Sequence, residues 1–511
     1  MDTTPDIPAR LIPTGEATAI LPVDFVGPGP RRSGGKPITV IANAAIRQTL
    51  DTPCLKQAIN SRLAPGVTDV IINPDAHLGY GAPVGCVLVS PTHIYPGPVG
   101  VDIKCSMSLL QLDVPSADLR DKKLRRALID AIVQRTPTGA GRGGTRHAPK
   151  ARRVDATMGL RVVTEGASEG VLRDLGVPVE WSNRCEDSSH TGHDGTSVSL
   201  RDRVDRLLAA DPAKERLFAD KMTQLGSYGG GNHFGECEDV RIVDSDRARA
   251  AAATFGLLDG RAAFLSHCGS RGWGAMLADR QFKTLQRKFE EWDIPLPGND
   301  RQLVYAPLGT AEADAYLDDM ALGANFATVN HLLINALVLE AFQEVLPGVR
   351  GELVYFISHN IARREIVNNQ PAWVHRKGAT RAFPAGHHAL KDTPFSATGH
   401  PILLPGNPQA GSAVMVAEPG AELSCYSVNH GAGRRMSRSA AAKTLDQKRV
   451  DESFARCDIL SNCRNYPIDE APKAYKDFED VLASVKTAGL ASEVARLHAR
   501  FVIKDGDKAD D

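Results

Sequence analysis

The chain has 511 residues, of which 42% are hydrophobic and 24% charged, and its formal net charge at pH 7 is −1. This composition is typical of a globular protein with a substantial core, and it excludes a largely disordered chain or one built of membrane spans. The near-zero net charge gives no global sign of nucleic-acid binding, so any basic surface must be local.

The cysteines and the apolar segments bear on the cellular compartment. Nine cysteines are scattered without the spacing of a small disulfide-rich protein, which indicates reduced thiols. The first residues lack the basic start and apolar core of a secretory signal, and the apolar run at 332–342 is too short to span a bilayer. We therefore expect a cytoplasmic protein without membrane association.

The first third of the chain combines predicted strands with polar loops. Residues 1–35 are rich in Pro and Gly and predict a flexible leader. Apolar runs at 69–72, 85–89 and 107–114 predict strands. The loop after the first contains Asp75, and the loop after the second contains Asp102 and Cys105. A carboxylate and a thiolate three residues apart can hold one metal or bridge two, although this spacing alone is weak evidence.

A basic stretch follows at 119–153. Its first half has the apolar spacing of a helix, and 136–144 form a Gly-rich loop. The stretch is compatible with a solvated helix face or with contacts to a phosphate backbone. Its cationic residues are Arg120, Lys122, Lys123, Arg125, Arg126, Arg135, Arg142, Arg146, Lys150, Arg152 and Arg153.

The segment at about 146–220 is polar and Gly-rich for much of its length and predicts a long excursion, with a helical stretch near 214–224. Within it, Cys185, His190 and His193 could bind zinc, but no fourth ligand is nearby. Asn232, His233 and Glu236 then follow three consecutive glycines, which allow a close backbone approach to a ligand.

Two further histidines follow predicted strands. Residues 262–266 read as a buried strand that runs into His267, and 353–358 read as a strand that ends at His359 and Asn360. Strand ends are positions where a rigid scaffold can hold metal ligands. The apolar spacing at 325–346 predicts a core helix in which His331 is structural.

The C-terminal third contains a histidine in a Gly-rich motif. His430 is followed by Gly431, Ala432, Gly433 and Arg434. Small residues leave backbone N–H groups open to phosphate oxygens, and an arginine can hold those oxygens with two parallel hydrogen bonds. A tight turn with an ordinary histidine is the alternative.

The segments around this motif also carry predicted elements and candidate cations. Lys377 lies beside a turn, 412–417 predict a strand, and 434–445 predict a helix. Lys476 is a further candidate cation near the C-terminus. The charged residues after 502 predict a frayed tail.

Taken together, Asp102, Cys105, His233, His267 and His359 supply oxygen, sulfur and nitrogen ligands for two divalent metals that share the Cys105 thiolate. Each residue alone is more often structural. The mixed donor set suits Mn²⁺, Zn²⁺ or Fe²⁺.

Several separated motifs resemble the RtcB-type RNA-splicing ligases, GTP-dependent enzymes that join an RNA 3′-phosphate or 2′,3′-cyclic phosphate to a 5′-hydroxyl. They span about residues 40–480 in the order of the family. The motifs are PDAHLG from Pro74, VDIKC from Val101, GNHF from Gly231, His267 with GSRG from Gly269, His359 with Asn360, HRKGATRAFP from His375, HGAGR from His430, and EAP from Glu470 with Tyr475 and Lys476.

The resemblance implies that His430 is the nucleophile that GTP guanylylates, with Asp75 beside it. It implies two Mn²⁺ ions bridged by Cys105, one completed by Asp102 and His233 and the other by His267 and His359. It also implies a guanylate site, with Lys377 and Arg434 near the phosphates. The residues implied for that site are Asn232, His233, Phe234, Gly235, Glu236, His359, Asn360, Lys377, Pro405, Gly406, Asn407, Ser412, His430, Gly431, Ala432, Gly433, Arg434, Lys476 and Asp75.

The expected fold is a mixed α/β domain at 36–502 with a central β core surrounded by helices, between the leader at 1–35 and a charged tail at 503–511. The expected substrate is broken RNA, and we expect a monomer. The need for an archease-type activator stays open.

Two departures from the family affect this expectation. Pro408 stands where the family usually has methionine, and the leader and the excursion differ from shorter members. Two other functions stay open: a di-metal phosphodiesterase that hydrolyses RNA ends without joining them, and a non-catalytic RNA-binding relative.

Overall fold

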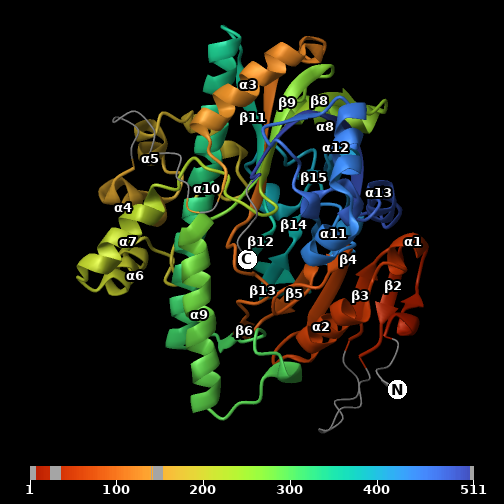
Figure 1. Ribbon diagram of the computed structural model, residues 1–511. Coiled ribbons are helices and arrows are strands. Elements are labelled where there is room, and N and C mark those ends of the chain that lie inside the picture. The colour runs from red at the N-terminus through yellow and green to blue at the C-terminus, as the bar shows by residue number, and fades with distance from the viewer. Residues whose placement is uncertain (1–6, 24–35, 140, 142–153, 507–511) are drawn as a thin grey trace.

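The computed structural model describes residues 7–23, 36–139, 141 and 154–506. It has the expected mixed α/β architecture, in which two large sheets lie among helices (Figure 1). The largest core cluster draws apolar residues from Ile7 to Ile503, so segments from both ends of the chain share it.

A seven-stranded sheet contains most of the N-terminal strands. Its strands, in spatial order, are β1 (Ile12–Pro13), β2 (Thr18–Leu21), β3 (Ile38–Ile41), β4 (Asp69–His77), β5 (Val84–Ser90), β13 (Gln370–Lys377) and β12 (Asn360–Val367). The β3–β4 pair is parallel and its other neighbouring pairs are antiparallel. Because β2 pairs with β3, the expectation of a flexible leader over all of 1–35 is wrong for Thr18–Leu21. Residues 24–35 lie outside the described part.

An eight-stranded sheet contains most of the remaining strands. These are, in order, β11 (Gly351–Ser358), β7 (Ser106–Pro115), β9 (Arg261–Cys268), β8 (Phe234–Ile242), β19 (Ala491–Lys504), β16 (Gly411–Ala417) and β15 (Pro401–Asn407), with β18 (Leu460–Ser461) beside β19. The register pairs Ile503 and Lys504 with β8. The predicted fraying after 502 is therefore wrong for these two residues, which are buried within the strand.

A 35-residue helix, α10 (Ala311–Val345), forms the centre of the helical layer, and α9 (Arg271–Glu291) and α3 (Lys122–Arg135) contact it (Figure 1). It is longer than the core helix predicted at 325–346. Its length and apolar composition would suffice to cross a membrane, but 94% of its most apolar window is buried within the protein. A helix that is apolar on all sides and surrounded by protein is a core helix.

The polar excursion is largely helical where it is described. Its elements are α4 (Ala156–Glu165), α5 (Glu169–Asp174), η4 (Val179–Arg184), α6 (Val198–Leu208) and α7 (Pro212–Met222). Because α4 and α6 contact α10 with apolar faces, the segment belongs to the core rather than forming an open loop. The helix predicted near 214–224 is confirmed as α7, but the sequence did not reveal the other helices, since their apolar faces are short and Gly-rich loops separate them.

The remaining elements are short connections and peripheral helices. They are η1 (Pro8–Arg10), α1 (Ala44–Arg47), α2 (Thr52–Leu63), β6 (His93–Ile94), η2 (Asp118–Arg120), α8 (Asp246–Phe255), η5 (Pro297–Asn299), β10 (Ala306–Pro307), β14 (Ala379–Arg381), η6 (His388–Leu390), η7 (Pro419–Ser424), β17 (Ser427–Asn429), α11 (Arg438–Thr444), α12 (Gln447–Arg456), η8 (Ile468–Glu470), η9 (Pro472–Ala474) and α13 (Phe478–Thr487). The helix predicted at 434–445 begins only at Arg438, because Ser437 caps it by accepting the Ala440 N–H.

Candidate active site and metal centre

The selected histidines, carboxylates and cysteine converge from distant segments on one cavity of about 340 Å³. Strand β9 contributes His267, the β11–β12 junction contributes His359, and the loop after β17 contributes His430. The cavity is lined by His77, Val84, Asp102, Cys105, Met107, Asn232, Phe234, His267, His359, Asn360, Lys377, Gly378, Pro405, Gly406, His430, Gly431, Ala432, Gly433, Arg434, Arg438 and Tyr475.

Two sets of metal-ligating atoms share the Cys105 thiol. One set is Cys105, His267 and His359, and the other is Asp102, Cys105 and His233; the ligand atoms within each set lie within 4.8 Å of one another. Cys105 Sγ is 3.1 Å from His267 Nε2 and 3.4 Å from His233 Nε2. His359 Nδ1 is buried and has no hydrogen-bond partner among the described residues. This donor set therefore fits two divalent metals with a bridging thiolate.

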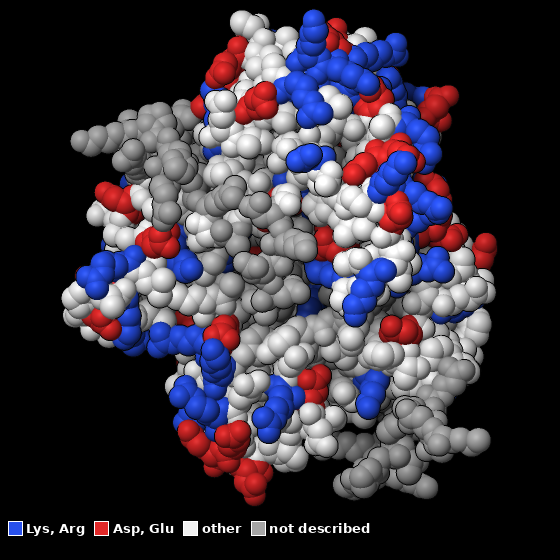
Figure 2. Space-filling view, viewed as in Figure 1, with Lys and Arg blue, Asp and Glu red and all other residues white. Residues whose placement is uncertain are grey.

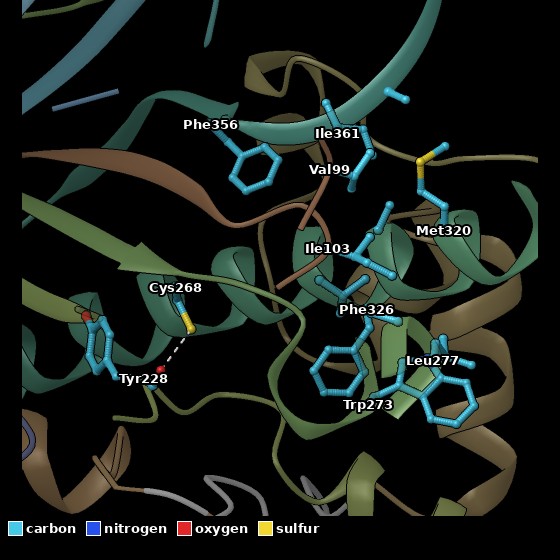
Figure 3. Packing of buried hydrophobic residues seen from close by; sticks show 14 of the residues in the cluster. Val99, Ile103, Tyr228, Cys268, Trp273, Leu277, Met320, Phe326, Phe356 and Ile361 are labelled. Carbon is cyan, nitrogen blue, oxygen red and sulfur yellow. Dashed lines mark hydrogen bonds between the residues drawn. The ribbon is translucent and has the colours of Figure 1, made fainter. Parts of the chain in front are cut away.

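A hydrogen bond to the backbone, outside the set of metal ligands, fixes the orientation of the His233 ring. Its Nδ1–H donates to the Tyr228 carbonyl oxygen at 2.8 Å, which leaves Nε2 facing Asp102 Oδ2 at 2.9 Å. Such a backbone partner is a common way to fix the tautomer of a ligating histidine. The same carbonyl oxygen accepts a hydrogen bond from the Cys268 thiol, so the residue after His267 is also held by Tyr228 (Figure 3).

Burial dominates the protonation of this cluster. It raises the pKa of the Cys105 thiol, and it lowers the pKa values of His267 and His359 well below the usual value, with neighbouring imidazoles adding to the effect. Burial acts to raise the pKa of Asp102, but hydrogen bonding to His233 prevails and the pKa lies below its usual value. Metal binding would therefore take up neutral imidazoles at His267 and His359 and displace the thiol proton of Cys105. Burial acts to lower the pKa of His233, but Cys105 and Asp102 prevail and raise it well above the usual value, so a metal would displace a proton there as well.

The loop that carries Asp102 and Cys105 is anchored on both sides. Ile103 packs against α10 at Gly323, where a methyl group would come within 3.2 Å of it, and Figure 3 shows Ile103 among Phe326 and other core residues. Lys104 has a left-handed φ of 55° and is fully buried. Its ammonium donates to the Asp187 carbonyl and to the Thr328 hydroxyl. The excursion thus supports the metal loop through Asp187.

The second focus of the cavity is His430. Its Nδ1 lies 2.8 Å from Asp75 Oδ2 and 3.0 Å from the Gly378 carbonyl oxygen. Both partners are acceptors, so Nδ1 carries the proton and Nε2 keeps its lone pair. The His430 ring lies 4.4 Å from the His359 ring, measured between centroids, so this nucleophile candidate adjoins the metal ligands.

A narrow second cavity opens beside the first and shares Phe234, Pro405, Gly406 and Tyr475 with it. Its other walls are Glu236, Asn407, Pro408, Ser412, Tyr466, Glu470 and Lys504. Most of the residues expected around a guanylate thus line one of the two cavities. His233, Gly235, Asp75 and Lys476 line neither and lie behind their walls.

Three expected cations differ in how available they are. Arg434 donates to Glu470 and to the Asp469 and Met436 carbonyls, so the expected two-point contact with a phosphate is not what its guanidinium does here. Lys476 donates to the carbonyls of Pro74 and Ala76. Lys377 lines the larger cavity, where its ammonium donates to the Tyr80 and Gly97 carbonyls, and burial lowers its pKa to about 7.

Sequence reasoning missed several residues of these walls. Arg438 lines the larger cavity and pairs with Asp469 and Glu470, and Lys504 lines the smaller one. Arg438 could have been found from its position one helical turn beyond Arg434. Lys504 had no sequence signal, because it lies in a segment expected to be frayed.

Two other sequence hypotheses fail on the described residues. Cys185, His190 and His193 do not meet: His190 contacts Lys104 and Arg363, and His193 contacts Asp318. Within the basic stretch, Arg125 is fully buried and pairs with Asp458, so it is structural. Figure 2 shows other Lys and Arg side chains gathered at the end of the molecule where Figure 1 places α3. Arg142, Arg146, Lys150, Arg152 and Arg153 lie outside the described residues.

Comparison with known proteins identifies the family. The family model described as tRNA-splicing ligase RtcB matches residues 57–505. The tRNA-splicing ligase RtcB of Pyrobaculum aerophilum is 33% identical over 499 residues, covering 94% of this chain and 97% of the relative. That of Archaeoglobus fulgidus is 34% identical over 90% and 92% of the two chains, and the RNA-splicing ligase RtcB of Mycobacterium bovis is 32% identical over 86% and 98%. The chain belongs to the RtcB family of RNA-splicing and tRNA-splicing ligases, and it is an enzyme.

Proposed function

We propose that this enzyme joins an RNA 3′-phosphate or 2′,3′-cyclic phosphate end to a 5′-hydroxyl end, with GTP as the energy source and His430 as the carrier of GMP. The observation that carries the proposal is the position of His430, whose Nε2 is free to react beside two metal-ligand sets that share one thiol. The resemblance of the motifs to GTP-dependent ligases supports GTP as the nucleotide.

The first chemical step follows from the tautomer of His430. Its Nε2 attacks the α-phosphorus of GTP, a P–N bond forms, and the P–O bond to pyrophosphate breaks. The proton on Nδ1 stays between Asp75 and the Gly378 carbonyl, and Asp75 offsets the positive charge that develops on the ring. A 2′,3′-cyclic phosphate end is first hydrolysed by water to a 3′-phosphate with a free 2′-hydroxyl. GMP then passes from His430 to the RNA 3′-phosphate, and attack by the 5′-hydroxyl forms the phosphodiester and releases GMP.

The metal centre would hold two Mn²⁺ ions, one at Asp102, Cys105 and His233 and one at Cys105, His267 and His359. Bound there, the metals would supply Lewis-acid stabilisation of the negative charge on the phosphates. The residues of this chain fix the spacing, since Lys104 and Ile103 anchor the loop that carries the shared thiol.

The narrow cavity, about 30 Å³ in this structure, is the proposed base pocket, and it has to widen to admit a guanine base. Glu236 lines it and can accept hydrogen bonds from the N1–H and the amino group of guanine, which adenine cannot offer. Pro408 also lines this cavity, so the departure from the usual methionine falls on the wall of the base pocket.

The cellular setting is part of the same proposal. The cysteines form no disulfide among the described residues, which suits a reducing cytoplasm. We propose a monomer that acts there on broken RNA, in RNA repair or tRNA processing, with the need for an archease-type activator open.

The test is covalent labelling of the full-length protein with α-³²P-GTP and Mn²⁺, followed by denaturation. We expect label on the wild type and on His388→Ala, which removes an exposed histidine, and none on His430→Ala. Absence of label on the wild type, or equal label on His430→Ala, would refute the ligase mechanism. Hydrolysis of cyclic phosphate ends without label would instead identify a phosphodiesterase, and RNA binding with neither activity a non-catalytic relative.

A further inference from the structure

A pair of buried glutamates stands at the base pocket. Glu236 and Glu238 lie two residues apart on β8, so their side chains point to the same face of the sheet. Only 3% of Glu236 and none of Glu238 is exposed to solvent. The mechanism proposed above uses Glu236, whereas Glu238 has no role in it.

The surroundings offer these carboxylates few polar partners besides each other and the Ser412 hydroxyl. The residues paired with Glu236 across the sheet are Leu265 and Val502, and those paired with Glu238 are Ala263 and Ala499. Neither oxygen of Glu238, nor Oε1 of Glu236, has a hydrogen-bond donor in normal geometry among the described residues. Two ionised carboxylates would repel each other here, whereas one shared proton turns their contact into a hydrogen bond.

The other ionisable groups around the pair are few. Lys504, Glu470, Tyr466 and Tyr475 line the same cavity as Glu236, and Asp239 follows Glu238 on β8. Asp239 is paired with Arg500. Lys504 donates to the carbonyl oxygens of Gly231 and His233 and pairs with Glu470.

These neighbours decide which carboxyl holds the proton. The charge of Lys504 lowers the pKa of Glu236, and no cation acts on Glu238 in the same way. Burial raises the pKa of Glu236 to about 8. Burial also raises the pKa of Glu238 well above the usual value, and the charge of Glu236 adds to this rise. The Ser412 hydroxyl acts to lower the pKa of Glu238. Glu236 therefore ionises first, and the proton that remains on the pair is held by Glu238.

We propose that Glu238 is a positioning residue for nucleobase selection: its protonated carboxyl donates a hydrogen bond to Glu236 and holds Glu236 as an ionised acceptor for guanine. This inference rests on the proposed GTP-dependent function. An ionised Glu236 matches the two donors on the Watson–Crick edge of guanine, whereas a protonated Glu236 would donate to N1 of adenine. The proton on Glu238 thus favours guanine over adenine.

The pair also predicts how affinity changes with pH. Guanine binds the ionised form of Glu236, whose pKa is about 8 in the free protein. Below that pH, binding must release a proton from Glu236, so affinity for a guanine nucleotide rises with pH through 7 and levels off above 8.

The test is calorimetric titration of the Mn²⁺-loaded full-length protein with GMP and AMP between pH 6 and about pH 9, a range that brackets the Glu236 pKa. Glu238→Leu removes the donor, so we expect about tenfold weaker GMP binding at pH 7, the loss of roughly one charge-assisted hydrogen bond, with recovery toward pH 9 and a smaller preference for GMP over AMP. Glu238→Gln keeps an N–H donor and should retain the wild-type affinity within about twofold.

Unchanged GMP affinity and pH profile in Glu238→Leu would overturn the inference, as would a loss in Glu238→Gln equal to that in Glu238→Leu. If Glu238→Leu does not fold, as judged by circular dichroism, the Glu238→Gln titration decides alone: retention supports the shared proton, and a tenfold loss refutes it. Covalent labelling of His430 in the wild type separates this outcome from failure of the proposed function.

Discussion

At the scale of single residues, the reactivity of His430 depends on what holds its Nδ1. Two acceptors, Asp75 Oδ2 and the Gly378 carbonyl oxygen, compete for one proton, and both require the tautomer that leaves Nε2 reactive. Asp75 is fully buried, so its charge acts on the imidazole with little screening by water. The carboxylate therefore contributes to the charge of the transition state more than to the position of the ring, which Gly378 also holds.

The substitution Asp75→Asn separates these two contributions. The amide oxygen can still accept from Nδ1, but the negative charge that stabilises a positive imidazole is lost. We expect the rate of covalent labelling by α-³²P-GTP to fall by at least about tenfold, while the Kd for GTP changes little. Single-turnover labelling and GTP titration measure the two quantities. A labelling rate equal to that of the wild type would show that the charge of Asp75 plays no part.

At the scale of elements, the site depends on how closely the loop after β17 approaches β4. A Cβ at Gly433, whose φ is 73°, would lie 2.1 Å from the Asp75 carbonyl oxygen. This contact is with the backbone, so no rotamer change can relieve it. The glycine brings the His430 loop against the strand that carries Asp75, which is the structural reason for a small residue in this motif.

Gly433→Ala should therefore separate His430 from Asp75. We expect covalent labelling to fall by at least tenfold, roughly the effect of displacing a reacting group by an ångström. The matched control is Gly489→Ala, because Gly489 has nearly the same φ, 72°, and its added methyl group would meet nothing within 4 Å. The control should lose only about 1 kcal/mol of stability and keep its labelling. Equal labelling by the two variants would argue against the close approach.

The same scale shows how far local sequence patterns predict the site. Strands near Asp75, His267 and His359 were predicted from their apolar runs, but β4 and β9 extend further than predicted and include Asp75 and His267. The helix near 214–224 was predicted, but α4 and α6 were missed, since each buries only a short apolar face against α10. Arg434 was expected at a phosphate, but its guanidinium donates a hydrogen bond to Glu470, which lies 36 positions later. A spacing rule carries no information about such a distant partner.

At the scale of the whole molecule, buried ion pairs join the excursion to the seven-stranded sheet and to the short β14–β17 pair. Arg381 of β14 contacts Glu186 and Asp187 of the excursion and Glu365 of β12. Arg376 of β13, fully buried, forms two hydrogen bonds to Glu365, at 2.7 and 2.8 Å. These strands also carry Asn360 and Lys377 to the cavity, so the ion pairs help to position its wall.

Glu365→Gln should reveal this contribution through its pH dependence. The arginines hold the pKa of Glu365 below its usual value despite burial. The stabilisation is therefore complete above the unfolded-state pKa, near 4.5, and is lost as pH falls through the lower folded-state pKa. We expect the variant to be less stable by about 3 kcal/mol at pH 7, because the buried Arg376 guanidinium loses its anion and Arg381 loses one of its three.

Denaturant unfolding from pH 7 to about pH 3.5 measures this difference, which should narrow below about pH 4.5 as the wild-type carboxylate becomes protonated. The exposed strand residue Glu352 provides the control, since Glu352→Gln should have little effect at any pH. A difference for Glu365→Gln that stays constant across this range would contradict the ion-pair explanation.

The surface of α3 provides the last prediction. Its buried Arg125 cannot reach RNA, so the reversal is restricted to the exposed Lys122, Lys123 and Arg126. If these side chains contact phosphates, reversing their charges should weaken RNA binding and reduce the slope of log Kobs against log salt by roughly 2 to 3. The control reverses Arg280, Lys283 and Arg287 on α9, at the other end of the molecule (Figure 1). Equal slopes in the two variants would make α3 an ordinary solvated helix.

The sequence by itself determined the mixed α/β class, several strands, and the residue types that a dinuclear centre and a nucleophilic histidine require. These follow from periodicity, Gly and Pro boundaries and ligand chemistry, all of which are local. Only the tertiary structure decided that Arg125 is buried, that Arg434 pairs with Glu470, and that Glu236 lies beside a second buried carboxyl. Those outcomes depend on which distant side chains packing brings together and on how much water it removes from them.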